Sequence, residues 1–248
     1  MTEFGTIDIM LPVHNEAQSI QNTLLEFHKQ ALSDGIDIRF VICEDGSKDN
    51  TVEVIRNLQT TLPIVLITSG ERKGYSRAVI DGLLATSSDF VGFIDSDGQC
   101  DPKDLKSFLK KMDSSQNCEL VMGHRHPRND HWIRLLMSIA FKLVYRLFFS
   151  VPVKDPSCPY LLIRRSALTR ILSGKVGLLK QGFWWEFLAR ATSLQVRLVE
   201  IPVAHRQRLC GLTQIYRPTK VPRIAYEHLL GLITLKRELS LIKGPRLK

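Results

Sequence analysis

The first 95 residues alternate short apolar runs with segments of helical periodicity, and this alternation limits the folds open to the chain. Strand-like runs are expected at residues 7–13, 38–43, 64–67 and 90–94. Helices are expected between them, at residues 16–32, 51–58 and 76–84. Strands that alternate with helices form a parallel sheet whose two faces are covered by the helices. We therefore predict an α/β fold with a mostly parallel central sheet and helices on both faces.

Polar clusters follow three of these predicted strands, at the point where each strand ends. The clusters are His14-Asn15-Glu16, Glu44-Asp45-Gly46-Ser47 and Asp95-Ser96-Asp97. In open α/β sheets, ligands bind beyond the carboxyl ends of the strands. The sequence therefore predicts a ligand site along one rim of the sheet.

Asp95 and Asp97 are candidates for a metal site, because two carboxylates at this spacing can approach one cation where the backbone turns. Hard carboxylate oxygens suit Mg²⁺ or Mn²⁺, which also bind diphosphate oxygens. Gln99 is a further oxygen donor at the same spacing. The alternative is that both aspartates only cap the next helix. Asp101 as N-cap and Pro102 at the first helical position already supply that helix start, so capping needs the pair less.

The second cluster combines a binding candidate with structural residues. Asp45 stands at the strand end and is the better candidate for hydrogen-bonding a nucleobase. Gly46 permits a tight turn, and Asp49 or Asn50 can cap the helix that follows. Asp49 and Thr51 are therefore expected to be mainly structural.

Charge divides the chain into two unlike halves. Residues 1–120 hold 11 Lys/Arg and 19 Asp/Glu, whereas residues 121–248 hold 23 and 6, a net charge of +17. An acidic half suits a metal, and a basic half suits phosphates, nucleic acid or an anionic lipid surface, unless it is only a solvated basic face. No nucleic-acid-binding signature occurs, so we expect no nucleic-acid partner.

The sequence favours a cytoplasmic location. We see no signal peptide at the N-terminus, and the five cysteines include no CxxC pair.

Two segments of the basic half are strongly apolar. Residues 132–153 are interrupted by Arg134, Lys142 and Arg146, which argues against a membrane span. Basic residues beside Trp and Phe fit a helix that lies in the membrane interface, and an ordinary core helix is the alternative. Residues 221–242 have a similar character. We therefore expect a peripheral protein on the cytoplasmic face of a membrane.

The three rim motifs resemble the signatures of family 2 glycosyltransferases. They are Pro12-Val13-His14-Asn15-Glu16, the run from Glu44 to Thr51, and Asp95-Ser96-Asp97-Gly98-Gln99. Within that family the chain most resembles the polyprenyl-phosphate (dolichyl-phosphate) mannosyl- and glucosyltransferases. Further matches are Gly123-His124-Arg125, Asp155-Pro156, the run around Glu186, Glu200-Ile201-Pro202-Val203, and the run from Arg208 to Thr213. The resemblance implies a single nucleotide-sugar-binding domain of the GT-A type over residues 1–215, followed by a C-terminal amphipathic helical tail over residues 216–248.

The resemblance also implies a reaction: metal-dependent, inverting transfer of a sugar from GDP-mannose or a UDP-hexose to a polyprenyl phosphate or another lipid acceptor. Donor binding then falls to Pro12, His14, Glu16, Asp45, Asp95 and Ser96. The metal ligands are Asp95, Asp97 and Gln99, holding Mg²⁺ or Mn²⁺ on the diphosphate. Asp97, Arg125 and Arg208 carry catalysis, and Arg134, Asp155 and Glu186 face the acceptor. A membrane-protein partner is a further expectation.

Departures from the family pattern leave the sugar and the acceptor open. His14 stands where the family usually has Tyr, Glu44 replaces an Asp, and Thr213-Gln214 replaces a Ser-Lys pair. A hydroxyl acceptor needs a general base, for which Asp155 or Glu186 is the candidate, whereas a lipid phosphate is already anionic and needs none. A nucleotidyltransferase is disfavoured because its Gly-rich activation loop with a Lys is not seen. The intact pair of aspartates argues against a non-catalytic homologue.

Overall fold

A computed structural model of the chain describes residues 4–115, 117–126, 132–174, 176–179, 182–207 and 221–242. Seven strands form one sheet in the order β3-β2-β1-β4-β6-β5-β7. The strands are β1 (Ile7–Val13), β2 (Ile38–Glu44), β3 (Ile64–Thr68), β4 (Phe90–Phe93), β5 (Leu120–Arg125), β6 (Leu161–Arg164) and β7 (Leu198–Val203). The helices are α1 (Ile20–Ser33), α2 (Thr51–Leu58), α3 (Tyr75–Ala85), α4 (Asp104–Ser114), α5 (Trp132–Phe148), α6 (Arg165–Leu172), α7 (Phe183–Ser193) and α8 (Val221–Ile242).

The sheet is mostly parallel, as predicted. Strands β1 to β4 run parallel, β5 and β7 run parallel, and only β6 is antiparallel to its neighbours β4 and β5 among the described strands. The chain moves outward from β1 to β2 and β3, and then returns across β1 to β4. Because parallel crossovers are right-handed, this reversal puts α3 on the face opposite α1 and α2. The point of reversal, between β1 and β4, is where such sheets bind ligands.

Two predicted helix starts differ from the structure. The first helix begins at Ile20 and not at residue 16, because Asn15 has a left-handed backbone (φ 55°) and residues 17–19 form a turn. The helix expected to start at Pro102 begins two residues later, at Asp104. Asp101 Oδ1 accepts the backbone N–H of Lys103 at 3.0 Å, so Asp101 closes a short turn before the helix instead of capping it.

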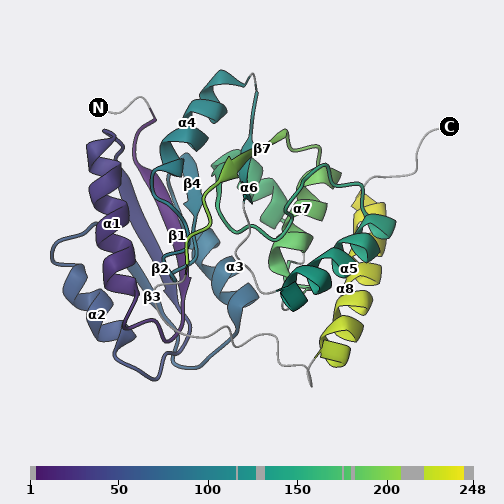
Figure 1. Cartoon of the computed structure of the whole chain (residues 1–248), viewed down its shortest axis with the longest axis horizontal. Helices are drawn as coiled ribbons and strands as arrows, with labels where there is room; N and C mark the ends of the chain where they lie inside the picture. The colour runs from purple at the N-terminus through teal and green to yellow at the C-terminus, as the bar shows by residue number, and fades with distance from the viewer. Residues whose placement is uncertain are drawn as a thin grey trace.

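The core has two parts. The larger part surrounds the sheet, and strands β1 and β4 are buried along their whole length. The smaller part lies between α5, α7 and α8, which lie together at one end of the molecule, far from α1 and α2 (Figure 1). Its buried residues are Tyr145, Phe149, Leu179, Trp185, Ala189, Leu232, Leu235 and Leu239. The C-terminal helix α8 is therefore packed on the domain.

Helix α5 is buried on one side and apolar on its exposed side as well. Tyr145 is buried, whereas Leu143 and Leu147 are exposed, the latter by 84%. Helix α8 likewise exposes Tyr226 and Leu230. In the part of the chain that the structure describes, no helix is long and apolar enough to cross a membrane.

Candidate active site

The loop after β1 is hydrogen-bonded to the loop after β2, which joins the first two sequence motifs. The Asn15 N–H donates to Ser47 Oγ at 2.9 Å, and the Lys48 N–H donates to Asn15 Oδ1 at 2.8 Å. The Glu16 N–H donates to Thr51 Oγ1 at 2.9 Å. Both motifs thus form one connected rim at the carboxyl ends of β1 and β2, with Glu16 half-buried in it.

Asp45 holds a third loop against this rim. Its two carboxylate oxygens accept backbone N–H groups, from Lys73 at 2.6 Å and from Gly74 at 2.8 Å. His14 Nδ1 lies 2.8 Å from the carbonyl oxygen of Asp45, which can only accept, so Nδ1 carries the proton. Asp45 is buried. It therefore shapes the site through the loop before α3, and its contact to a nucleobase stays a prediction.

Gly46 is required by a close approach of two backbones. Its φ is +65°, and a Cβ there would lie 2.6 Å from the backbone nitrogen of Arg72. Asp49 Oδ1 accepts the backbone N–H of Thr51 at 3.1 Å and its hydroxyl at 2.5 Å. These contacts agree with the structural part expected of Asp49 and Thr51.

The acidic loop after β4 is next to the loop after β1, because β4 pairs with β1 in the same direction. Asp97 and Ser96 are buried, and Asp95 is half-buried. Asp97 Oδ1 accepts the backbone N–H of Gln99 at 3.1 Å. Gln99 in turn donates its side-chain amide to the carbonyl oxygen of Arg206 at 3.1 Å. The loop is thus anchored both internally and to the segment that follows β7.

The donor set of this loop fits a cation that arrives with a diphosphate. Within the described residues, no three His, Cys, Asp or Glu side chains gather into a metal-binding cluster. Asp95 and Asp97 offer two hard carboxylates on a rim whose next strand end carries His14 and Glu16. Mg²⁺ usually takes one or two protein carboxylates and completes its octahedron with substrate phosphates and water. The two aspartates match that requirement.

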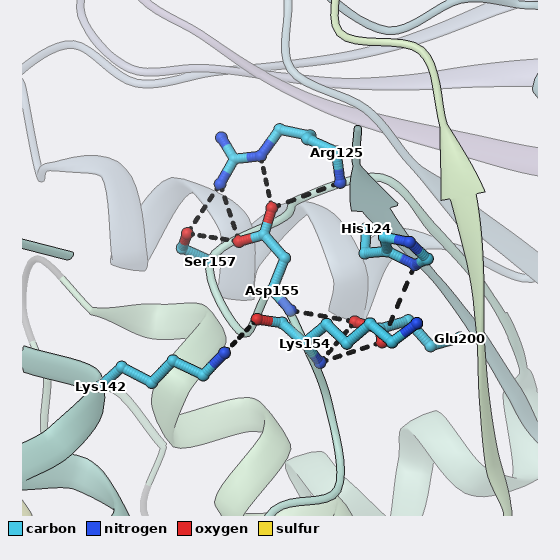
Figure 2. A network of polar contacts seen from close by, with 7 residues as sticks. All are labelled: His124, Arg125, Lys142, Lys154, Asp155, Ser157 and Glu200. Carbon is cyan, nitrogen blue, oxygen red and sulfur yellow. Dashed lines mark hydrogen bonds and ion pairs between the residues drawn. The ribbon is translucent and has the colours of Figure 1, made fainter. Parts of the chain in front are cut away.

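Arg125 and Asp155 bind each other. Arg125 Nε donates to Asp155 Oδ2 at 2.7 Å and Nη2 donates to Oδ1 at 3.0 Å, and both side chains are nearly buried. Ser157 Oγ accepts from Arg125 Nη2 at 2.7 Å and donates to Asp155 Oδ1 at 2.9 Å. Figure 2 shows this bidentate ion pair between Arg125 at the end of β5 and Asp155 in the loop before β6. Asp155 therefore fixes the guanidinium plane of Arg125.

Glu200 on β7 binds the backbone of the same loop. Its carboxylate accepts the backbone N–H of Lys154 at 2.9 Å and that of Asp155 at 3.0 Å. His124 Nδ1 lies 3.8 Å from Glu200 Oε2, and Lys142 of α5 donates to the carbonyl oxygen of Lys154 (Figure 2). The loop that carries Asp155 is thus tied to β5, β7 and α5.

Glu186 lies in the interior, with its side chain 1% exposed. It accepts the backbone N–H groups of Gly177 at 3.1 Å and Leu179 at 2.9 Å, and Arg190 Nε at 2.9 Å. Arg190 also pairs with Glu238 of α8 at 3.1 Å. These contacts give Glu186 a structural part in joining α7 to its preceding loop and to α8. Its expected contact to the acceptor stays a prediction.

Three further residues were predicted to belong to the site: Pro12, Arg134 and Arg208. Pro12 is buried within β1, directly before the rim. Arg134 falls within α5, but its side chain lies outside the described part of the molecule. Arg208 lies outside the described residues altogether. Sequence reasoning missed Tyr75, whose hydroxyl donates to Asp95, and Trp184, which donates to that hydroxyl. The signal in the sequence was the Phe-Trp-Trp-Glu-Phe run that contains Trp184.

The fold and rim together define a glycosyltransferase of the GT-A type: a mostly parallel sheet with acidic loops at its switch point. Residues 8–172 match the family model described as glycosyl transferase family 2. This match covers more than half of the chain, and the chain belongs to that family.

Curated relatives agree with this assignment. An uncharacterized glycosyltransferase of Mycobacterium tuberculosis is 27% identical over 212 residues, which cover 84% of this chain and 89% of the relative. An undecaprenyl-phosphate 4-deoxy-4-formamido-L-arabinose transferase of Edwardsiella ictaluri is 25% identical over 239 residues, covering 94% of this chain and 71% of that protein.

Solved structures share the fold at low sequence identity. Glucosyl-3-phosphoglycerate synthase of Mycobacterium tuberculosis, in complex with Mn²⁺, UDP and glucosyl-3-phosphoglycerate, superposes with a TM-score of 0.68 at 19% identity, covering 93% of this chain and 79% of that chain. Mannosyl-3-phosphoglycerate synthase of Rubrobacter xylanophilus gives 0.65 at 15% identity, covering 97% and 77%.

Proposed function

We propose that the chain transfers a sugar from a nucleotide-sugar to a polyprenyl phosphate, with inversion and with Mg²⁺ or Mn²⁺. The observation that carries the proposal is the rim formed by the carboxyl ends of neighbouring strands. Asp95 and Asp97 follow β4, which pairs with β1, and His14 and Glu16 follow β1. His14 is in turn hydrogen-bonded to the carbonyl oxygen of Asp45, which follows β2. The name of the Edwardsiella ictaluri relative supports a polyprenyl-phosphate acceptor. The fold neighbour in complex with Mn²⁺ and UDP supports a metal-bound nucleoside diphosphate.

The chemistry requires charge stabilisation on the leaving group. A divalent cation, when bound, neutralises charge that develops on the nucleoside diphosphate. Asp95 and Asp97 would hold that cation, and His14, Glu16 and Asp45 would line the nucleoside side of the rim. Arg125 carries a guanidinium whose orientation is fixed by Asp155, and a fixed planar fork suits phosphate oxygens. Arg208 and Arg134 are proposed as further phosphate contacts.

The two candidate bases favour a phosphate acceptor over a hydroxyl. Asp155 is paired with Arg125, and Glu186 is paired with Arg190 in the interior. Each carboxylate would have to break an ion pair with a buried arginine before it could take a proton. A lipid phosphate needs no base, so this reaction asks nothing of either residue.

Membrane association is the second part of the proposal. Helices α5 and α8 expose Leu143, Leu147, Tyr226 and Leu230, and Arg146 is exposed beside them. Apolar side chains among basic ones suit the surface of an anionic bilayer. We expect co-sedimentation with anionic vesicles, partly reversed by salt, and weaker binding to neutral vesicles.

A matched pair of surface leucines tests this association. Leu147→Ser should weaken vesicle binding, and Leu32→Ser on α1, where Leu32 is 64% exposed, should not. Equal binding to neutral and anionic vesicles would contradict the electrostatic part. Capture by a membrane protein in place of lipid would appear as binding to native membranes but not to protein-free vesicles.

The transfer itself is tested with a panel of nucleotide-sugars, Mn²⁺ and lipid extract, following nucleoside diphosphate release and a glycosylated lipid product. Asp97→Asn should lower kcat by roughly 100-fold or more, as is typical when a group that stabilises transition-state charge is lost. Asp113→Asn, an exposed aspartate at the end of α4, is the control. Near-normal turnover by folded Asp97→Asn protein, or full activity in excess EDTA, would contradict the metal role.

A further inference from the structure

The hydroxyl of Tyr75 lies between an indole and a carboxylate of the rim. Trp184 Nε1 is 3.0 Å from Tyr75 Oη, and Tyr75 Oη is 3.0 Å from Asp95 Oδ1. Tyr75 is the first residue of α3 and Trp184 the second of α7, 109 positions further along the chain. None of the rim motifs contains either residue.

The direction of both hydrogen bonds follows from the groups alone. An indole N–H can only donate, so the phenol oxygen of Tyr75 must accept from Trp184. The phenol has a single hydrogen, and an ionised carboxylate can only accept, so that hydrogen points to Asp95. The three groups therefore form a relay with one orientation: Trp184 donates to Tyr75, and Tyr75 donates to Asp95.

The relay is anchored at both ends. Trp184 is buried and packs edge-to-face on Phe93, with ring centroids 4.4 Å apart. Phe93 is the last residue of β4, two positions before Asp95. On the α3 side, Ser76 Oγ donates to the carbonyl oxygen of Leu179 at 3.1 Å. The phenol of Tyr75 is thus fixed relative to the strand that delivers Asp95.

The residues directly before Tyr75 also bind Asp45 of the second rim motif. Backbone N–H groups of Lys73 and Gly74, directly before Tyr75, hold the carboxylate of Asp45. Residues 73–75 therefore contact a nucleoside-side aspartate through the backbone and Asp95 through a side chain. A displacement of this segment would move both.

We propose that Tyr75 and Trp184 are positioning residues for the metal ligand Asp95: the relay fixes the rotation of its carboxylate, so that the cation meets it in one orientation. The inference rests on the metal role proposed for Asp95. Outer hydrogen-bond partners of metal ligands commonly matter 10- to 100-fold for metal affinity. A relay of purely structural importance would alter stability and leave the affinity for the cation unchanged.

The test measures Mn²⁺ binding by electron paramagnetic resonance, with the full chain and with UDP or GDP present. Tyr75→Phe keeps the ring and removes the hydroxyl, and should raise the Kd for Mn²⁺ about 10-fold or more. Tyr145→Phe is the matched control, because it also removes one buried hydroxyl, which donates to the carbonyl oxygen of Trp185 at 2.9 Å. That control should lower Tm to a similar extent and leave Mn²⁺ binding unchanged.

Two further variants separate the possible failures. Trp184→Phe removes the donor to Tyr75 together with part of the buried ring, and it leaves the hydrogen bond from Tyr75 to Asp95 in place. It should weaken Mn²⁺ binding by a smaller factor than Tyr75→Phe, and it replaces Tyr75→Phe if that variant does not fold. Asp95→Asn should abolish the binding. If Asp95→Asn loses Mn²⁺ while Tyr75→Phe binds it like the unaltered protein, the relay is overturned and the metal role stands. If Asp95→Asn still binds Mn²⁺ normally, the proposed metal site itself is wrong.

Discussion

Replacing Glu186 by Gln should destabilise the fold while leaving the chemical step nearly unchanged. The Glu186 carboxylate accepts three N–H groups, from Gly177, Leu179 and Arg190, all within 3.1 Å. A glutamine side chain has one oxygen, and its amide group is a donor, so at least one of these contacts becomes donor against donor. Arg190, which is 2% exposed, also loses the negative charge of Glu186 and keeps its ion pair with Glu238.

The size of the effect follows from burial. Removing one partner of a buried ion pair costs about 3–5 kcal/mol, and the remaining contact to Glu238 argues for the lower end, about 3 kcal/mol. For a chain of this length, each kcal/mol lowers Tm by about 2–4 °C, so a decrease of about 6–12 °C is expected. Glu26→Gln is the surface control. Glu26 is 49% exposed and pairs with Arg206, and its loss should cost less than about 1 kcal/mol.

The assay combines thermal unfolding by circular dichroism with kcat measured well below the Tm of the variant. We expect the lowered Tm together with a kcat within about fivefold of the unaltered protein when lipid phosphate is the acceptor, because such a step has no need of a base. An unchanged Tm with a kcat several hundredfold lower would refute the reasoning. That result would make Glu186 a general base and favour a hydroxyl acceptor.

Three further outcomes follow from other contacts. Burial alone would raise the pKa of Asp8, but hydrogen bonds from backbone N–H groups and from Arg39 lower it below its usual value. The ionised Asp8 therefore stabilises the fold above about pH 4. This contribution to the free energy of unfolding should be lost on acidification, and it should be absent at every pH in Asp8→Asn. Gly46→Ala should lower Tm measurably and weaken UDP or GDP binding, because its Cβ would meet the backbone of Arg72. Burial lowers the pKa of His228, so the unfolded chain binds its proton more readily and stability falls as pH drops below about 6.5; hydrogen exchange in α8 should accelerate there, and less so in His228→Phe.

The N-terminal half of the fold could be predicted because its signals are local. Apolar runs and helical periodicity identified β1 to β4 and the helices between them, and the parallel arrangement then followed from their alternation. The antiparallel strand β6 could not be anticipated, because it has only four residues and its direction is set by pairing with β4 and β5. The two misplaced helix starts had local causes too, a left-handed Asn15 and a turn closed by Asp101.

The candidate site was predictable as a place and less so as a set of contacts. The positions of Asp45, Asp95 and Asp97 followed from strand ends, since carboxyl ends of parallel strands share a rim. The pairing of Arg125 with Asp155 spans 30 positions, and single-residue roles assigned along the chain do not reveal that two candidates bind each other. The hydrogen bond from Trp184 to Tyr75 spans 109 positions, and Tyr75 belongs to none of the sequence motifs.

The outer position of β7 has a consequence for association of the chain with itself. An edge strand offers unpaired backbone groups to which another chain can add a strand. In β7, Pro202 has no N–H to donate. Proline on an edge strand discourages strand addition. This edge of the sheet therefore discourages strand addition by a second copy of the chain.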